Sequence, residues 1–283
     1  MDIELISAEL RPRRPWEAVD LGISLGRRHI GKLLLFWVAS VLPLIVILSA
    51  LLWNHFQVLV LVIWWLKPLY DRVPLYYLSR ALFGSAPTLR EFLRILPRLW
   101  SRRVLDALIL GRFSLARSIV LPIKELEGLK GGAYTSRRDA LLRSSAGPGQ
   151  WFTALCLGLE HFFAFALVLF ATSAIPVVAP PDPVSYVQTL SELIVTGEFA
   201  LDPLVVAGVL GAWIVSLTFV ENLYVAGGFG LYLNARTELE GWDVELTFRR
   251  IANRIRRIRA GGVPALVVVG IGLALLAGTS GAR

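Results

Sequence analysis

Four charged side chains lie inside or beside long apolar stretches, where each needs a partner of opposite charge. They are Lys67, Asp71, Glu160 and Glu221. A charge in the hydrocarbon core of a bilayer costs at least about 2.5–3.5 kcal/mol, and a partner of opposite charge lowers that cost. The four residues therefore form a predicted intramembrane polar network. One interpretation is a site for an ion, a proton or a lipid headgroup; the other is a structural ion pair that fixes which helices pack together.

A short internal repeat relates Lys67 to Glu221. If the repeat is real, a pseudo-two-fold axis along the membrane normal brings these two residues to similar depth. Counted along straight helices, the two depths are roughly 17 and 27 Å, and the long lysine stem shortens that gap. If the repeat is not real, Lys67 should pair with Glu160 instead. The matched segments are KPLY (67–70) followed by YLSR (77–80), and ENLY (221–224) followed by YLNAR (232–236).

The composition predicts a protein that resides in lipid. Of 283 residues, 55% are hydrophobic and only 18% are charged, and the mean hydropathy is +0.63. Soluble domains carry about 25% charged residues. The single cysteine, Cys156, excludes a disulfide framework within the chain, and three histidines leave little room for a metal site built from histidines.

The apolar runs predict an all-α membrane protein with about five transmembrane helices, since a span needs roughly 20 apolar residues. No cleavable signal peptide is predicted. The second apolar run is free of charged residues only as far as Leu66, so it must continue through Lys67 and Asp71 to cross the membrane. The predicted spans are residues 30–53, 56–77, 151–178, 203–233 and 263–277.

Lys and Arg counts beside the spans predict the orientation. The N-terminal segment through Lys32 has six basic residues, thirteen lie between Arg80 and Arg143, and seven between Arg236 and Arg259. The turn 54–55 and the loop 180–202 contain none. This alternation predicts a multi-pass membrane protein with its N-terminus inside and its C-terminus outside.

Two basic amphipathic helices are predicted on the cytoplasmic side. TLRE (88–91) is a capping box that opens a helix, and Pro97 is expected to bend it. Such a helix either lies in the headgroup layer or packs on its own protein. Residues 244–259 form the second helix, and residues 128–150 are expected to be an exposed loop. The predicted lipid or partner surface consists of Arg90, Arg94, Arg98, Arg102, Arg249, Arg250, Arg254, Arg256 and Arg257.

The fourth span contains small residues that predict close helix packing. Gly227, Gly228 and Gly230 lie in one half, where they can equally let the helix bend, and Gly208 and Gly211 lie in the other half.

These features divide the chain into six predicted parts. They are an N-terminal cytoplasmic segment (1–29), a hairpin of spans one and two (30–79), a cytoplasmic basic region (80–150), a hairpin of spans three and four (151–234), a cytoplasmic basic helix (235–262), and span five with a short outer tail (263–283).

Four blocks of sequence resemble an uncharacterised proteobacterial inner-membrane family. Its genes tend to lie beside a MoxR-type AAA+ ATPase, and its members typically carry a C-terminal extracytoplasmic domain. Because the sequence ends at Arg283, this chain is expected to be either a short member or a truncated one. Members often have Glu-Pro where this chain has Glu221-Asn222. The resemblance implies a multi-pass protein of the bacterial inner (plasma) membrane, with the N-terminus in the cytoplasm and the C-terminus in the periplasm. It further implies a membrane component of an envelope-associated MoxR system and no assigned reaction. The blocks are RPRRPWEAVDLG (11–22), WWLKPLYDRVPL (64–75), LSRALFG (78–84) and YVAGGFGLYLNARTELEGWDVELTFRR (224–250).

The sequence favours a non-enzymatic membrane scaffold or accessory subunit, because no P-loop, Rossmann fingerprint or catalytic triad is recognisable. The expected partners are the lipid bilayer, anionic headgroups, and other membrane or AAA+ components. No cofactor is expected, and no nucleic acid, since no aromatic–basic interleaving accompanies the charge. The alternatives are a small transporter or channel subunit that uses Lys67, Glu221 and Glu160, and a lipid-modifying enzyme.

Overall fold

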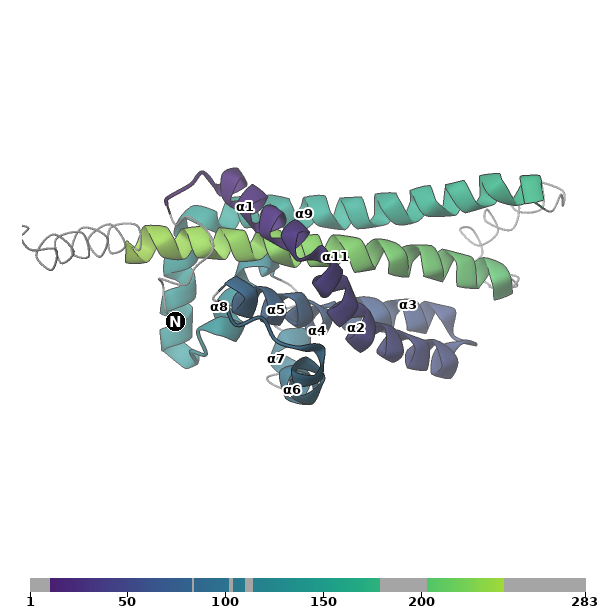
Figure 1. Cartoon of the computed structure of the whole chain (residues 1–283), viewed down its shortest axis with the longest axis horizontal. Coiled ribbons are helices and arrows are strands. Elements are labelled where there is room, and N and C mark those ends of the chain that lie inside the picture. Colours follow the sequence, from purple (N-terminus) through teal and green to yellow (C-terminus); the bar gives the residue numbers. More distant parts are fainter. Residues whose placement is uncertain (1–10, 83, 102–103, 110–113, 179–202, 242–283) are drawn as a thin grey trace, which may run out of the picture. The chain divides into compact units, whose positions relative to one another are not determined.

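The computed structural model describes residues 11–82, 84–101, 104–109, 114–178 and 203–241, and within these ranges the chain forms helices and no strand. The prediction of an all-α protein is therefore confirmed (Figure 1). The helices are α1 (Pro15–Arg28), α2 (Ile30–Leu52), α3 (Phe56–Trp65), α4 (Lys67–Tyr70), α5 (Arg72–Leu82), α6 (Leu89–Ser101), α7 (Val104–Leu108), α8 (Arg117–Leu126), α9 (Gly131–Val178) and α11 (Pro203–Glu240).

Three of the described helices are long and apolar enough to cross a membrane. They are Ile30–Leu52, Gly131–Ala171 and Val205–Glu240, and α3 is a shorter apolar helix of 10 residues. These spans make the chain a membrane protein by length and composition. The predicted fifth span, residues 263–277, and the predicted helix 244–259 lie outside the described residues.

Exposed apolar side chains cover a long stretch of two of these helices. On α2 they extend from Leu35 to Leu51, and on α9 from Trp151 to Phe170. At 1.5 Å per residue these stretches are about 24 and 29 Å long, close to the ~30 Å of a hydrocarbon core. We call this surface the apolar belt. In a bilayer whose core matches this length, the ends of the belt would lie beside the headgroups.

The segment predicted as the second span, residues 56–77, is not one continuous helix. The helix ends at Trp65, a four-residue helix follows from Lys67, and a third helix begins at Arg72. The cause is Pro68, because its nitrogen has no hydrogen to donate and its ring clashes with the preceding turn. Pro74, in contrast, lies in the first turn of α5, where proline is tolerated. The break leaves Lys67 just after the end of an apolar helix of only 10 residues.

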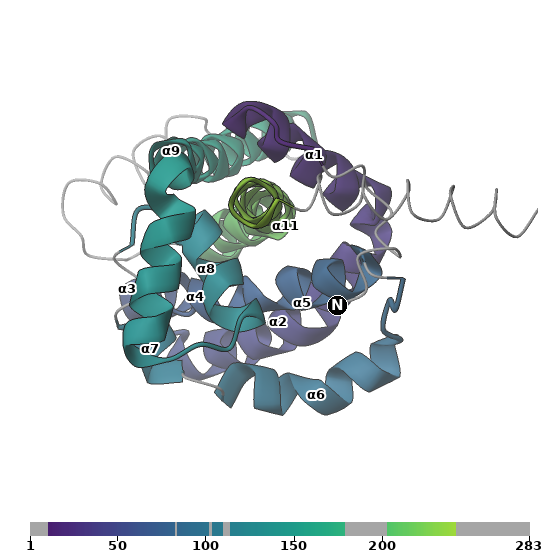
Figure 2. The ribbon, with the colours of Figure 1, turned by 90° about the vertical axis from the view of Figure 1, so that its left-hand side faces the viewer.

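The prediction of an exposed loop over residues 128–150 is wrong. Only the turn around Gly128 and Gly131 is non-helical, and both glycines have the positive φ that suits such a turn. From Gly131 the chain is helical, because Leu141 and Gly149 pack against the protein and the helix buries this face on α8. Figures 1 and 2 show α9 changing direction between its two halves, as expected of a helix that contains Pro148.

The half of α11 that contains Gly227, Gly228 and Gly230 is buried among other helices. Figure 2 shows this helix end-on, with α1, α8 and α9 around it. A Cβ atom on Gly230 would lie 2.2 Å from the Ala18 carbonyl oxygen of α1, and one on Gly228 would lie 2.3 Å from the Ser118 carbonyl oxygen of α8. Only glycine allows backbones to approach this closely. The predicted close packing at these positions is confirmed, and α11 is one helix through all three.

The same prediction is wrong for Gly208 and Gly211. A Cβ atom at either position would have nothing within 4 Å among the described residues. These glycines lie in the first turns of α11, away from the region where α1 and α8 pack against the helix.

Candidate functional site: a buried ion network in the membrane region

Lys67 lies between two buried carboxylates. Its ammonium is 3.0 Å from Glu221 Oε2 on α11, and it also donates a hydrogen bond to Glu160 Oε2 on α9. All three side chains are at most 2% exposed. The predicted contact between Lys67 and Glu221 is therefore present, and so is the alternative contact with Glu160. The two candidate partners bind the same lysine at once.

Glu160 has both of its carboxylate oxygens occupied. One accepts from Lys67, and the other accepts from the indole nitrogen of Trp213 at 2.9 Å. The hydroxyl of Ser216 donates to the backbone carbonyl of Glu160 at 2.7 Å. Glu160 lies nine residues from Trp151 at the edge of the apolar belt, or about 14 Å along the helix. The network thus lies near the middle of the belt.

Arg117, the first residue of α8, extends the network to Asp71. Its guanidinium is 3.4 Å from Asp71 Oδ2 and 3.8 Å from Glu221 Oε1. It also lies over the ring of Tyr224, 5.5 Å from the centroid. Asp71 therefore belongs to the predicted group of charges, but its partner is Arg117 rather than Lys67.

Arg117 is the residue that sequence reasoning missed. Its sequence signal is weak, because it lies in a region of thirteen basic residues that was interpreted as a cytoplasmic surface. The residues that follow it, from Ser118 to Ile123, are nevertheless mostly apolar. A charge at the start of an apolar run is compatible with either a surface helix or a buried helix. In the structure α8 is buried.

The five charged groups do not balance. Lys67 and Arg117 are cations, whereas Asp71, Glu160 and Glu221 carry carboxylates, so the formal sum is one negative charge when all are ionised. The Asp71 oxygens and Glu221 Oε1 are buried without a hydrogen-bond donor. Such an arrangement can hold a shared proton or a small cation, because an uncompensated charge is unfavourable at low dielectric.

A second buried ion pair connects α5 to α8. Arg72 is 3.0 Å from Glu125 and donates a hydrogen bond to the carbonyl of Leu99 on α6 at 2.8 Å. Sequence reasoning did not predict this pair either. These contacts connect α5, which was predicted to lie in the second span, with α6 and α8, which were predicted to lie in the cytoplasmic basic region.

The basic helix α6 is packed on its own protein. Phe92 is fully buried, and its ring centroid is 4.7 Å from that of Phe36 on α2. The predicted capping box is confirmed: the Thr88 backbone N–H donates to Glu91 Oε2 at 3.0 Å, and the Glu91 N–H donates to Thr88 Oγ1 at 3.3 Å. These bonds, with the Thr88 backbone N–H as the main cause, lower the pKa of Glu91 below its usual 4.5. Pro97 lies inside the helix without ending it.

The predicted basic surface is only partly described by the structure. Arg90, Arg94 and Arg98 lie on α6 and are exposed. The remaining members lie outside the described residues, and they are Arg102, Arg249, Arg250, Arg254, Arg256 and Arg257.

The N-terminal segment is attached to α11 by a reciprocal hydrogen-bond pair. The backbone N–H of Arg13 donates to Asn234 Oδ1 at 2.8 Å, and the Asn234 amide donates to the Arg13 carbonyl at 3.0 Å. Sequence reasoning treated residues 1–29 as a plain cytoplasmic segment and missed both α1 and this anchor.

Among the residues that the structure describes, no group of three or more His, Cys, Asp or Glu side chains is placed to hold a metal ion. Comparison with protein-family models, curated proteins and solved structures finds no match to this chain. The geometry of the ion network and of α6 is therefore the basis for the function proposed below.

Proposed function

We propose that this protein is a membrane scaffold or accessory subunit in which the ion network locks the helices together and α6 presents a basic face to a partner. The observation that supports this proposal is the internal pairing of Lys67. Its charge is divided between two buried glutamates on different helices, so the lysine joins α4, α9 and α11. A structural pair uses its charges in this way, and removing one partner leaves an uncompensated charge.

The exposed arginines of α6 are the proposed partner surface. Arg90, Arg94 and Arg98 are held on a helix that is fixed by Phe92 and by the capping box, so their spacing is set before a partner arrives. Pre-ordered groups bind with less loss of conformational entropy. With the N-terminus in the cytoplasm of an inner membrane, as the basic loops favour, this face meets cytoplasmic proteins. The sequence resemblance makes a MoxR-type AAA+ ATPase the first partner to test.

Photocrosslinking in native membranes tests the scaffold proposal. A photoreactive residue replaces Arg94 on the exposed face of α6, and a matched control places it at Val46, which is 58% exposed within the apolar belt. We expect a discrete protein adduct from position 94 and lipid adducts from position 46. Absence of any protein adduct from positions 90, 94 and 98 would contradict the proposal.

A transporter or channel subunit is the second candidate, and the charge imbalance of the network favours it. Three carboxylates face two cations, and Asp71 lacks a hydrogen-bond donor. A proton or cation that binds there and leaves again would make the network a transport site. Glu221→Gln discriminates the two functions when the protein is reconstituted in vesicles that contain a pH-sensitive dye. A transport site loses proton flux while the protein stays folded, whereas a structural pair loses thermal stability.

A further inference from the structure

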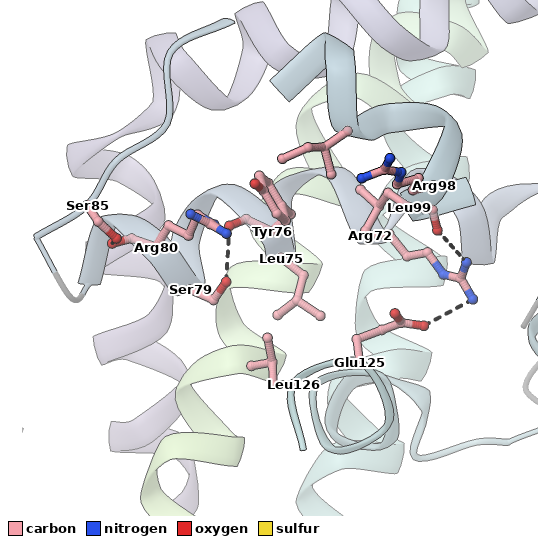
Figure 3. A pocket seen from close by; sticks show the side chains of 11 residues that line it. Arg72, Leu75, Tyr76, Ser79, Arg80, Ser85, Arg98, Leu99, Glu125 and Leu126 are labelled. Carbon is pink, nitrogen blue, oxygen red and sulfur yellow. Dashed lines mark hydrogen bonds and ion pairs between the residues drawn. The ribbon is translucent and has the colours of Figure 1, made fainter. Parts of the chain in front are cut away.

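A cavity of about 470 Å³ lies between α5, α6 and α8, outside the ion network (Figure 3). Its walls combine aliphatic and basic side chains with one carboxylate, that of Glu125. Leu75 comes from α5, Ile95 and Leu99 from α6, and Leu126 from α8, while Arg80 and Arg98 come from α5 and α6. A cavity of this composition accepts an anion that carries an apolar part.

Arg80 and Arg98 are not neutralised by an ion pair with another described residue. Arg72, the third arginine of the wall, is already paired with Glu125 and with the carbonyl of Leu99, as Figure 3 shows. Arg80 stacks on the ring of Tyr76 at 5.0 Å from the centroid. In the part of the chain that the structure describes, neither Arg80 nor Arg98 has a carboxylate within 4.0 Å. The nearby Glu91 carboxylate, which senses the charge of Arg80, is bonded to Thr88 instead.

The cavity lies at the level of the headgroups. The ring centroid of Tyr77, on the same helix as Arg80, is 5.0 Å from that of Phe36. Phe92 of α6 also packs against the ring of Phe36. Phe36 adjoins Leu35, where the apolar belt of α2 begins. The guanidinium groups of α5 and α6 are therefore close to the plane in which lipid phosphates lie, and the aliphatic wall adjoins the acyl region.

We propose that this cavity binds the phosphate headgroup of an anionic phospholipid, with Arg80 and Arg98 contacting the phosphate and the leucine-lined wall contacting the first part of an acyl chain. Arginine suits this role because its planar fork binds phosphate through paired hydrogen bonds. The proposal rests on the position of α6 beside the membrane. It shares Arg98 with the proposed partner surface, and the two roles are tested apart because crosslinking and lipid binding are separate measurements.

Native mass spectrometry of the full-length protein in neutral detergent tests this site. Dioleoylphosphatidylglycerol is titrated against wild type, against Arg80→Gln/Arg98→Gln, and against the control Arg90→Gln/Arg94→Gln, which removes two exposed charges that do not line the cavity. We expect the cavity variant to lose at least about tenfold in affinity, or 1.4 kcal/mol. The control should lose no more than about threefold, as expected for general attraction of anionic lipid to basic residues.

Three outcomes would overturn the proposal. Equal losses in both double variants would reduce the effect to general surface charge, and an unchanged affinity in the cavity variant would exclude the site. Displacement of the lipid by inorganic phosphate or glycerol 3-phosphate at comparable concentration would identify a soluble anion as the ligand instead. The thermal midpoint of each variant verifies its folding, and the single variants R80Q and R98Q replace the double variant if it does not fold.

Discussion

At the scale of single residues, the molecule is organised around Lys67. A lysine at the end of a short apolar helix has few ways to remain charged in a membrane, and two glutamates on separate helices supply them. Glu160 is further fixed by Trp213, and Glu221 is shared with Arg117. The same contacts serve both candidate functions, so the effect of each substitution on stability decides between them.

Replacing Lys67 by methionine should destabilise the protein strongly. Both Glu160 and Glu221 would lose their cation in a buried setting, which typically costs about 3–5 kcal/mol. The matched control is Lys32→Met, because Lys32 is exposed on α2 and should change stability by no more than about 0.5 kcal/mol. Equilibrium unfolding in mixed micelles measures both variants. Equal stability of the two would contradict the structural role, and exchanging the charges of Lys67 and Glu221 should restore part of the loss.

The capping box gives a prediction about pH. The pKa of Glu91 is lowered in the folded protein, so the carboxylate stabilises the start of α6 above its ordinary pKa of 4.5. That contribution is lost as the pH falls through the lowered folded pKa. NMR titration of the Glu91 carboxyl carbon measures this value directly. We expect Thr88→Ala to raise the pKa toward 4.5, and a wild-type Glu91 that titrates at or above 4.5 would refute the capping bonds.

At the scale of elements, close approach and proline breaks determine how the helices fit. Gly22 of α1 faces Ala226 of α11, and Gly230 of α11 faces Ala18 of α1, so each helix offers a glycine to the other. Pro68 interrupts the second apolar segment, so that α4 and α5 follow α3 as separate helices.

Substitution of glycine by alanine in α11 should therefore depend on position. Gly230→Ala places a Cβ 2.2 Å from the Ala18 carbonyl oxygen and should cost about 1–3 kcal/mol, because α1 must move. Gly208→Ala meets nothing within 4 Å, and it should be neutral or stabilising by up to about 1 kcal/mol through helix propensity. Thermal unfolding of the two purified variants compares them. A loss in Gly208→Ala as large as in Gly230→Ala would argue against the glycine contact.

At the scale of the whole molecule, the predicted topology can be tested with the described residues alone. Asn54 lies in the exposed turn between α2 and α3, and Arg94 lies on the exposed face of α6. If the N-terminus is cytoplasmic, these two positions are on opposite sides of the membrane.

Cysteine labelling in intact cells measures this orientation. Cys156 is buried and is first replaced by alanine, which leaves a background without thiols. We expect Asn54→Cys to react with a membrane-impermeant maleimide in cells whose outer membrane has been permeabilised. Arg94→Cys should react only after the inner membrane is opened. Reaction of both cysteines from the same side would show that the predicted alternation of basic loops does not govern this chain.

The sequence by itself determined the helical class, the membrane character, the capping box of α6 and the residues of the central ion pair. These features follow from local properties, because apolar length, cap chemistry and the penalty for a buried charge are all readable from neighbouring residues. Lys67 could be matched with Glu221 or with Glu160 because a charge in an apolar segment needs an opposite partner, and the internal repeat put Glu221 first.

Only the tertiary structure decided which further groups join that pair and how the chain makes room for them. Arg117 belongs to a basic region by sequence, yet the fold buries its helix against Gly228 of α11 and brings it to Asp71. The helical course of residues 131–150 likewise comes from packing on α8, which outweighs the turn-like Gly147-Pro148. The physical reason is that rotation, tilt and close approach of helices depend on contacts between residues far apart in the chain, which local hydropathy and charge do not encode.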